Sequence, residues 1–237
     1  ISVGMSGNGP LIELASLKEY GLKKKPKIVL WFYFERNDLE DLRDEKSNSL
    51  FMKYLNEGFD QDLYSKQTEI DKKLRTYIKL AEEELINGES STDQDSEKFL
   101  SFKKILRLKI LRDKMSLDRG LDFGIDPLFG KIIASAKDFI NTWDGKLYFV
   151  YLPAYPSFSQ EKITQQVMIG LQRYKEIIKI INDLDIPLID VNKEFQNYEN
   201  PLELWPNATL KYRHLNELGY EKTTDIIFKK ILEFENY

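Results

Sequence analysis

Short, almost continuous apolar runs alternate along this chain with longer amphipathic stretches. Four runs rich in β-branched and aromatic residues predict strands buried on both faces: Ile1–Val3, Lys27–Phe34, Lys146–Pro153 and Ile186–Val191. Helical patterns follow most of these runs, at residues 10–22, 163–184 and 216–234. Strands that alternate with helices predict a parallel sheet with helices on both faces, which is a doubly wound α/β domain.

The alternation stops between Asn37 and Asp126. Helical patterns cover Ser49–Gly58, Gln61–Asn87 and Lys98–Asp118, and a polar loop separates the last two. We therefore predict one α/β domain over residues 1–237 that carries a helical insertion over residues 45–126. The insertion is either a cap over one edge of the domain or a dimerisation or partner surface, and the sequence does not separate these hypotheses.

Composition excludes several classes of protein. Hydrophobic residues make up 42% of the 237 residues and charged residues 31%, which is typical of a globular domain with a substantial core. The net charge of -4 argues against nucleic acid as a partner, since a nucleic-acid binder carries a basic face. The chain has no cysteine and one histidine, so thiolate and histidine-rich metal sites are excluded. We expect neither a metal nor a cofactor.

The single histidine, His214, is the first candidate for catalysis. Ligands bind beyond the carboxyl ends of the strands in an open parallel sheet, and His214 lies in the last loop of the predicted sheet. It directly precedes a helix whose start is marked by Asn216. A lone surface histidine is usually not catalytic, but a histidine in this position can act as a general base at neutral pH.

Two loops after predicted strands offer hydrogen-bond donors. Asn37 follows the most hydrophobic run, and it either caps a helix or donates from its amide to a developing oxyanion. Gly7 lies in the glycine-rich loop after the first run. It either permits a tight turn or presents its backbone N–H to the same oxyanion.

These elements, in this order, resemble the SGNH/GDSL hydrolase superfamily of serine esterases and acyltransferases, which has four sequence blocks. The segment GMSGNGP is similar to the second block and puts Gly7 at the oxyanion position, while ERNDL is similar to the third block and puts Asn37 there. The segment HLNELGY is similar to the end of the fourth block, with His214 as the base. Longer phrases, such as KPKIVLWFYFERNDLEDL, are similar to a bacterial subgroup of that superfamily.

The resemblance implies a flavodoxin-like three-layer α/β/α fold and ester hydrolysis or O-acyl transfer. The expected substrates are acyl esters, above all acetyl esters, of a carbohydrate or a small molecule. We expect Asn8, Tyr155 and Arg36, which lie in loops after predicted strands, to contact the substrate. The resemblance also favours a place in the bacterial cell envelope.

Two departures from the family pattern concern single residues. Arg36 stands where the third block has glycine, and Lys211 stands where the fourth block has the aspartate that orients the histidine. The histidine must then be oriented by another acid, by a backbone carbonyl or by no group at all. We expect the acid to be among Asp38, Asp190 and Glu203.

The third departure from the family pattern concerns the first sequence block, which carries the nucleophilic serine. This block is missing before Gly7. Ser6, Ser157 and Ser159 are poor substitutes because none lies in a nucleophile motif. The first strand of a flavodoxin-like sheet lies inside the sheet, so its absence would leave an open strand edge. We therefore expect the strand and its serine to come from an N-terminal segment of the same protein, and we expect the 237-residue chain alone to be inactive.

Two other hypotheses remain from the sequence. A catalytically inactive binding or scaffold protein of the same fold would explain Arg36 and Lys211 and could use the helical insertion as its interface. A nucleotide-binding loop at Gly4–Gly9 is weakly supported, because its glycine spacing differs from the dinucleotide-binding fingerprint.

Overall fold

The chain forms two compact units in the computed structural model. The structure describes residues 1–5, 7–87, 124–158, 165–206 and 214–235. The first unit comprises Ile1–Gln61 and Phe123–Tyr237, and the second comprises Asp62–Asp122. Residues 45–61, which the sequence grouped with the helical insertion, fall in the first unit.

A parallel three-stranded sheet lies at the centre of the first unit. Strands β1 (Ile28–Phe34), β2 (Lys146–Leu152) and β3 (Leu188–Asp190) follow in the order β1-β2-β3. β1 and β2 pair along their whole length, from Ile28 opposite Lys146 to Phe34 opposite Leu152. The three strands confirm the predicted runs, with a shorter β3, and their ends at Phe34, Leu152 and Asp190 lie at one edge of the sheet.

The predicted strand at Ile1–Val3 is wrong. These residues have no strand structure, and Ile1 is 95% exposed. A strand needs a neighbour to pair with its backbone groups. No strand of the described residues occupies the free edge of β1, where such a neighbour would lie.

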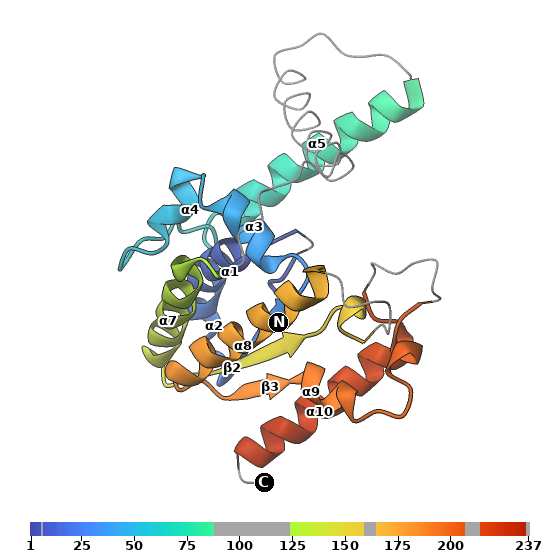
Figure 1. Cartoon of the computed structure of the whole chain (residues 1–237). Helices are drawn as coiled ribbons and strands as arrows, with labels where there is room; N and C mark the ends of the chain where they lie inside the picture. The colour runs from blue at the N-terminus through green and yellow to red at the C-terminus, as the bar shows by residue number, and fades with distance from the viewer. Residues whose placement is uncertain (6, 88–123, 159–164, 207–213, 236–237) are drawn as a thin grey trace. The chain divides into compact units, whose positions relative to one another are not determined.

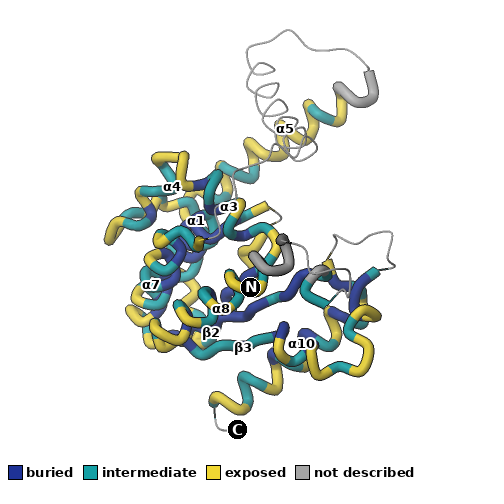
Figure 2. Tube along the Cα trace, viewed as in Figure 1, coloured by how far each residue is buried: buried dark blue, intermediate teal, exposed yellow. Residues whose placement is uncertain are grey.

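One face of the sheet carries the larger apolar core. Trp31 and Tyr33 of β1 and Phe149 of β2 pack there against the helices α1 (Pro10–Ser16), α7 (Pro127–Asn141) and α8 (Gln165–Asp183). After α1 the chain continues as a π-helix at Leu17–Gly21 and as α2 (Leu22–Lys24). Figure 2 shows β2 as the most continuously buried segment of the unit.

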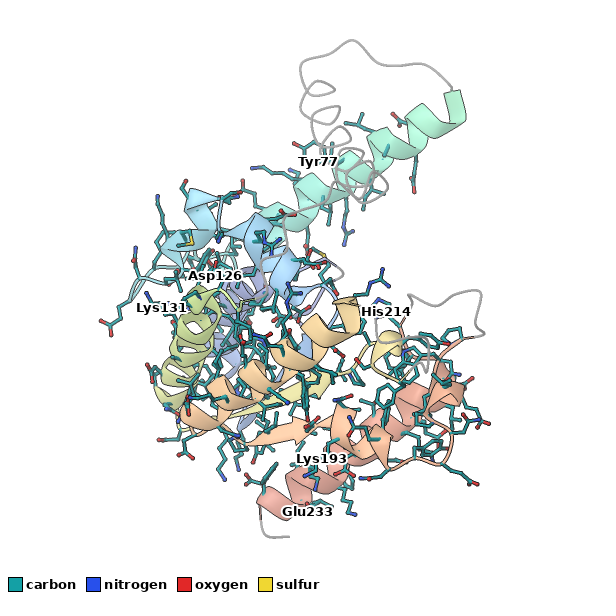
Figure 3. All side chains as sticks on the ribbon, viewed as in Figure 1. Tyr77, Asp126, Lys131, Lys193, His214 and Glu233 are labelled. Atoms are coloured by element: carbon teal, nitrogen blue, oxygen red, sulfur yellow. The ribbon has the colours of Figure 1, made fainter. Side chains whose placement is uncertain are left out.

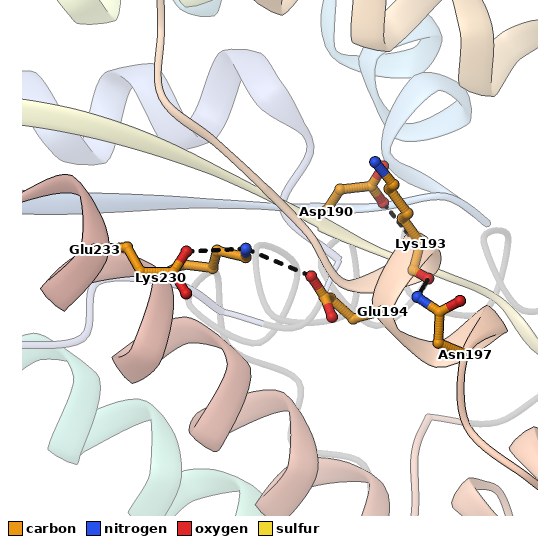
Figure 4. A network of polar contacts seen from close by, with 6 residues as sticks. All are labelled: Asp190, Lys193, Glu194, Asn197, Lys230 and Glu233. Atoms are coloured by element: carbon orange, nitrogen blue, oxygen red, sulfur yellow. Dashed lines mark hydrogen bonds and ion pairs between the residues drawn. The ribbon is translucent and has the colours of Figure 1, made fainter.

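The opposite face carries a second core. Tyr148 and Val150 of β2 pack there with Trp205, α9 (Val191–Gln196) and α10 (Glu217–Phe234), on the side of the sheet opposite α7 and α8 (Figure 1). Lys230 of α10 forms ion pairs with Glu194 of α9 and with Glu233 (Figure 4). The first unit is therefore a mixed α/β domain with helices on both faces of a parallel sheet.

Three helices lie within residues 38–87, and the last two are shorter than the helices predicted at Ser49–Gly58 and Gln61–Asn87. These are α3 (Asp38–Glu45) and α4 (Ser49–Lys53) in the first unit and α5 (Gln67–Asn87) in the second. The helix predicted at Lys98–Asp118 lies outside the described residues. Two 3₁₀ helices, Tyr155–Ser157 and Pro201–Leu204, follow β2 and α9.

Candidate functional site

Glu35 joins the carboxyl ends of β1 and β2. Its backbone N–H donates to the carbonyl of Leu152, and its carboxylate accepts a 2.9 Å hydrogen bond from the N–H of Ala154. The hydroxyl of Ser157 also donates to this carboxylate, at 2.8 Å. Burial raises the pKa of Glu35, and these two donors act in the opposite direction. The Ser157 hydroxyl thus has a structural partner.

Asn37 and Asp38 begin helix α3 just beyond β1. The buried Asp38 carboxylate accepts a 2.8 Å hydrogen bond from the N–H of Phe34. The side chain of Asn37 makes no capping bond to the helix, although Asn37 stands at the capping position. Its Nδ2 instead donates to Asp41. The amide of Asn37 therefore uses one of its two N–H hydrogens to bind Asp41. It retains the second N–H hydrogen as a donor.

The glycine loop forms a turn. The N–H of Asn8 donates to the carbonyl of Met5, and Gly7 has a φ of 82°, the left-handed region that favours glycine. The turn alternative for Gly7 is therefore observed. Its role as an oxyanion donor stays a prediction.

Glu45 of α3 binds the start of α1. Its two carboxylate oxygens accept from the backbone N–H groups of Gly9, at 2.6 Å, and Leu11, at 2.9 Å. A Cβ on Gly9 would lie 2.8 Å from both the Cβ of Asp41 and Oε2 of Glu45, so glycine permits this close approach. The first turn of α1 has free N–H groups, and a buried carboxylate is a strong partner for them.

Four acids gather between α1 and α3, and we call Glu13, Asp38, Asp41 and Glu45 the carboxylate cluster. Burial, followed by repulsion from the other three acids, raises the pKa of Glu13 well above its usual range. Burial, with repulsion from Asp41 and Glu45, raises the pKa of Asp38 to about 8. Oε2 of Glu13 is buried without a hydrogen-bond partner. The cluster therefore holds protons at neutral pH.

Glu13, Asp41 and Glu45 were not predicted as site residues from the sequence. The available signal was the spacing of acids on α3, where Asp38, Asp41 and Glu45 recur at helical intervals and return to one face. Charged residues on a short helix usually face solvent, so this pattern alone predicts a solvated surface.

His214 lies exposed beside the end of β1. Its ring stacks on the ring of Phe34, with centroids 5.2 Å apart and an interplanar angle of 30°. The buried Leu215 follows, and Oδ1 of Asn216 accepts from the N–H of Gly219 at 2.9 Å, which confirms the predicted start of α10. Figure 3 shows His214 on the side of the sheet toward which the strand arrows point.

The three acids proposed to orient His214 have other partners. Asp38 binds the N–H of Phe34, and Asp190 caps α9 through the N–H of Lys193 (Figure 4). Glu203 accepts from Nδ2 of Asn200 at 2.6 Å. Within the described ranges we find no hydrogen bond from any of the three to the imidazole. Lys211 lies outside those ranges, as do Ser6 and Ser159.

The expected substrate contacts are spread over the site. Arg36 is exposed directly after Glu35, and Asn8 lies in the glycine turn. The ring of Tyr155 meets Trp205 edge to face, with centroids 6.0 Å apart. The structure thus brings His214 to the strand end that precedes Arg36 and Asn37, while Tyr155 belongs to an aromatic group on the α10 side of the sheet.

No protein-family model, curated protein or solved structure matches this chain. Among the described residues, no group of histidines and acids could hold a metal ion, and no helix is both long and apolar enough to cross a membrane. The class that fold and site define is a mixed α/β protein with an exposed imidazole and a bound amide near the carboxyl end of one strand.

Proposed function

We propose that this chain supplies the base and the oxyanion donors of a serine esterase or O-acyltransferase of the SGNH/GDSL type. The substrate is an acyl ester, above all an acetyl ester, of a carbohydrate or a small molecule. The observation that carries the proposal is the stacking of His214 on Phe34. It brings an exposed imidazole, from the last loop of the chain, to the strand end that Asn37 follows.

The reaction proceeds by covalent catalysis. A serine hydroxyl attacks the acyl carbonyl carbon while His214 takes the hydroxyl proton. The amide of Asn37 and the backbone N–H of Gly7 hold the negative charge on the carbonyl oxygen. The tetrahedral intermediate then expels the alcohol, which takes the proton from His214. Water or a second hydroxyl completes the cycle by attack on the acyl-serine.

The free edge of β1 supports a nucleophile on an additional strand. Within the described part of the chain, β1 pairs with β2 alone, so one edge of a seven-residue strand presents unpaired backbone groups. Phe32, in the middle of β1, is 43% exposed, which is unusual for a strand of such apolar sequence. A parallel strand along this edge, with its helix over Phe32, would complete a flavodoxin-like sheet and carry the serine.

The partners of Ser157 argue against an internal nucleophile. Its hydroxyl donates to the carboxylate of Glu35, at 2.8 Å from Oε1. We therefore expect the 237-residue chain alone to be inactive and the protein that includes an upstream serine-bearing segment to be active.

The test uses p-nitrophenyl acetate and an acetylated glycan as substrates for the protein expressed with its native upstream coding sequence. We expect turnover that falls by roughly 10³-fold or more in His214→Ala and by on the order of 10²–10³-fold in Asn37→Ala. The matched control is Asn197→Ala, at an exposed asparagine of the first unit whose side chain donates to the carbonyl of Lys193. A fluorophosphonate probe identifies the nucleophile.

Three outcomes oppose the proposal. Absence of turnover on both substrates rejects the activity, and turnover that survives His214→Ala rejects the base. Labelling of Ser157 in the 237-residue chain rejects the upstream nucleophile.

A catalytically inactive binding protein is the second candidate, and one observation favours it. In the second unit, α5 exposes Leu74, Tyr77 (labelled in Figure 3) and Ile78 at helical spacing, and Leu74 is 53% exposed. An apolar stripe of this kind is typical of a partner surface. A folded protein without esterase activity on either substrate would favour this candidate.

A further inference from the structure

Asn37 must present an N–H, and not its carbonyl oxygen, if it is to stabilise an oxyanion. A side-chain amide has donors on one side and an acceptor on the other, and a rotation of 180° about its last bond exchanges them. The exchanged orientation would point the carbonyl oxygen at the developing negative charge. The site therefore needs a group that selects one orientation of the amide.

Asp41 is the group that faces the Asn37 amide. It lies one turn along α3 and accepts from Nδ2 of Asn37. An ionised carboxylate only accepts hydrogen bonds, so it binds the nitrogen side of the amide and excludes the exchanged orientation. One hydrogen of Nδ2 is used in this bond, and the other is left for a ligand.

Glu45 extends this arrangement to the glycine loop. It lies one turn beyond Asp41 on α3 and holds the N–H groups of Gly9 and Leu11. Helix α3 therefore carries, on one face, an acceptor for the Asn37 amide and an acceptor for the start of α1. The Asn37 amide and the glycine loop are therefore both held by the same helix.

We propose that Asp41 is a positioning residue that holds the Asn37 amide with its N–H toward the oxyanion, while Glu45 fixes the same helix to the glycine loop. This inference rests on the proposed function. Asp41 acts through Asn37 and is given no contact with the substrate.

The carboxylate cluster has an electrostatic cost, because its acids repel one another. The charge of Asp41 raises the pKa of Glu13, Asp38 and Glu45. Removal of that charge should therefore stabilise the fold at neutral and alkaline pH. If Asp41 had a purely structural role, the protein should lose stability when the contact of Asp41 is weakened. Under the proposal, the variant instead gains stability and loses activity.

The test compares Asp41→Asn with Glu40→Gln, which removes an exposed charge from the same helix. Asparagine at position 41 can donate or accept, so it no longer selects the orientation of Asn37. We expect Asp41→Asn to lower kcat on p-nitrophenyl acetate by about tenfold with KM unchanged, because one oxyanion donor is partly lost. We expect the same variant to unfold at a higher urea concentration at pH 8. Glu40→Gln should change neither quantity.

A second measurement needs no activity. In nuclear magnetic resonance spectra of the 237-residue chain, the Nδ2 hydrogen of Asn37 that binds Asp41 should be shifted and exchange more slowly than in a free asparagine amide, and this departure should collapse in Asp41→Asn. If no ester is turned over but the collapse is seen, the proposed function fails while the positioning of Asn37 stands. Unchanged Asn37 signals, an unchanged kcat, or a kcat and stability that fall together would overturn the role of Asp41.

Discussion

The two sides of the candidate site are built differently. On the α1–α3 side, the glycine turn and Asn37 are held by hydrogen bonds to Asp41 and Glu45 of one helix. On the histidine side, His214 rests on the ring of Phe34, and Asn216, two residues further on, caps α10. Directional bonds to carboxylates fix the orientation of a group, whereas ring stacking fixes its location and leaves more freedom of rotation.

This difference shows for which side of the candidate site the sequence pattern is informative. On the α1–α3 side, Asn37 and the glycine loop both have hydrogen-bond partners within the described residues. On the histidine side, no acid of the described residues binds the imidazole, and Lys211 stands where the sequence pattern that this chain resembles has an aspartate.

The largest expected effect concerns the carboxylate cluster. The pKa of Asp38 is raised in the folded protein, so the folded state binds a proton that the unfolded state has released above pH 4. Stability contributed by this proton is present at low pH and is lost as the pH rises toward and through about 8. When the pH is raised from 5 to 9, the wild type should lose more free energy of unfolding than Asp38→Asn. The expected difference between the two losses is on the order of 3 kcal/mol.

Urea unfolding at a series of pH values measures this effect. Asp138→Asn, which alters an exposed carboxylate on α7, is the control and should follow the wild-type curve. Parallel curves for the wild type and Asp38→Asn would show that the cluster holds no proton at Asp38.

A smaller effect is expected at the contact between the glycine loop and α3. In Gly9→Ala, the added methyl group would lie 2.8 Å from both the Cβ of Asp41 and Oε2 of Glu45. The backbone of Gly9 is extended, so the substitution adds no backbone strain, and the expected cost of about 2 kcal/mol comes from overpacking alone. Gly4→Ala is the matched control, because a methyl group there meets nothing within 4 Å. Equal stability of the two variants would show that α3 does not hold the loop.

Much of the fold could be predicted from the sequence, because buried parallel strands are continuous apolar runs. The runs at β1 and β2 were placed within one residue of their ends. The prediction at Ile1–Val3 failed because the short run Ile-Ser-Val can form a buried strand only where a neighbouring strand exists to pair with it. Apolar periodicity carries no information on whether the partner strand is present.

The candidate site was predictable only in part. His214 and Asn37 follow from their places after strands, and the structure brings them to the end of β1. The acids that bind the donors could not be predicted, since Asp41 and Glu45 sit on a short polar helix whose buried face is set by the contact with α1. Which charges become buried depends on tertiary packing and not on local pattern.

The smallest effect is expected on the histidine side. Phe34→Leu keeps an apolar residue at the end of β1 but removes the ring that His214 stacks on, so it should cost about 1 kcal/mol of stability. His214→Ala should change stability by less than about 0.5 kcal/mol, since the imidazole is exposed and makes no hydrogen bond to the described residues. The informative measurement is the shift of the imidazole proton signals, which should lose the ring-current contribution in Phe34→Leu. If those signals do not move, the imidazole does not rest on Phe34, and the two sides of the site are not joined through the end of β1.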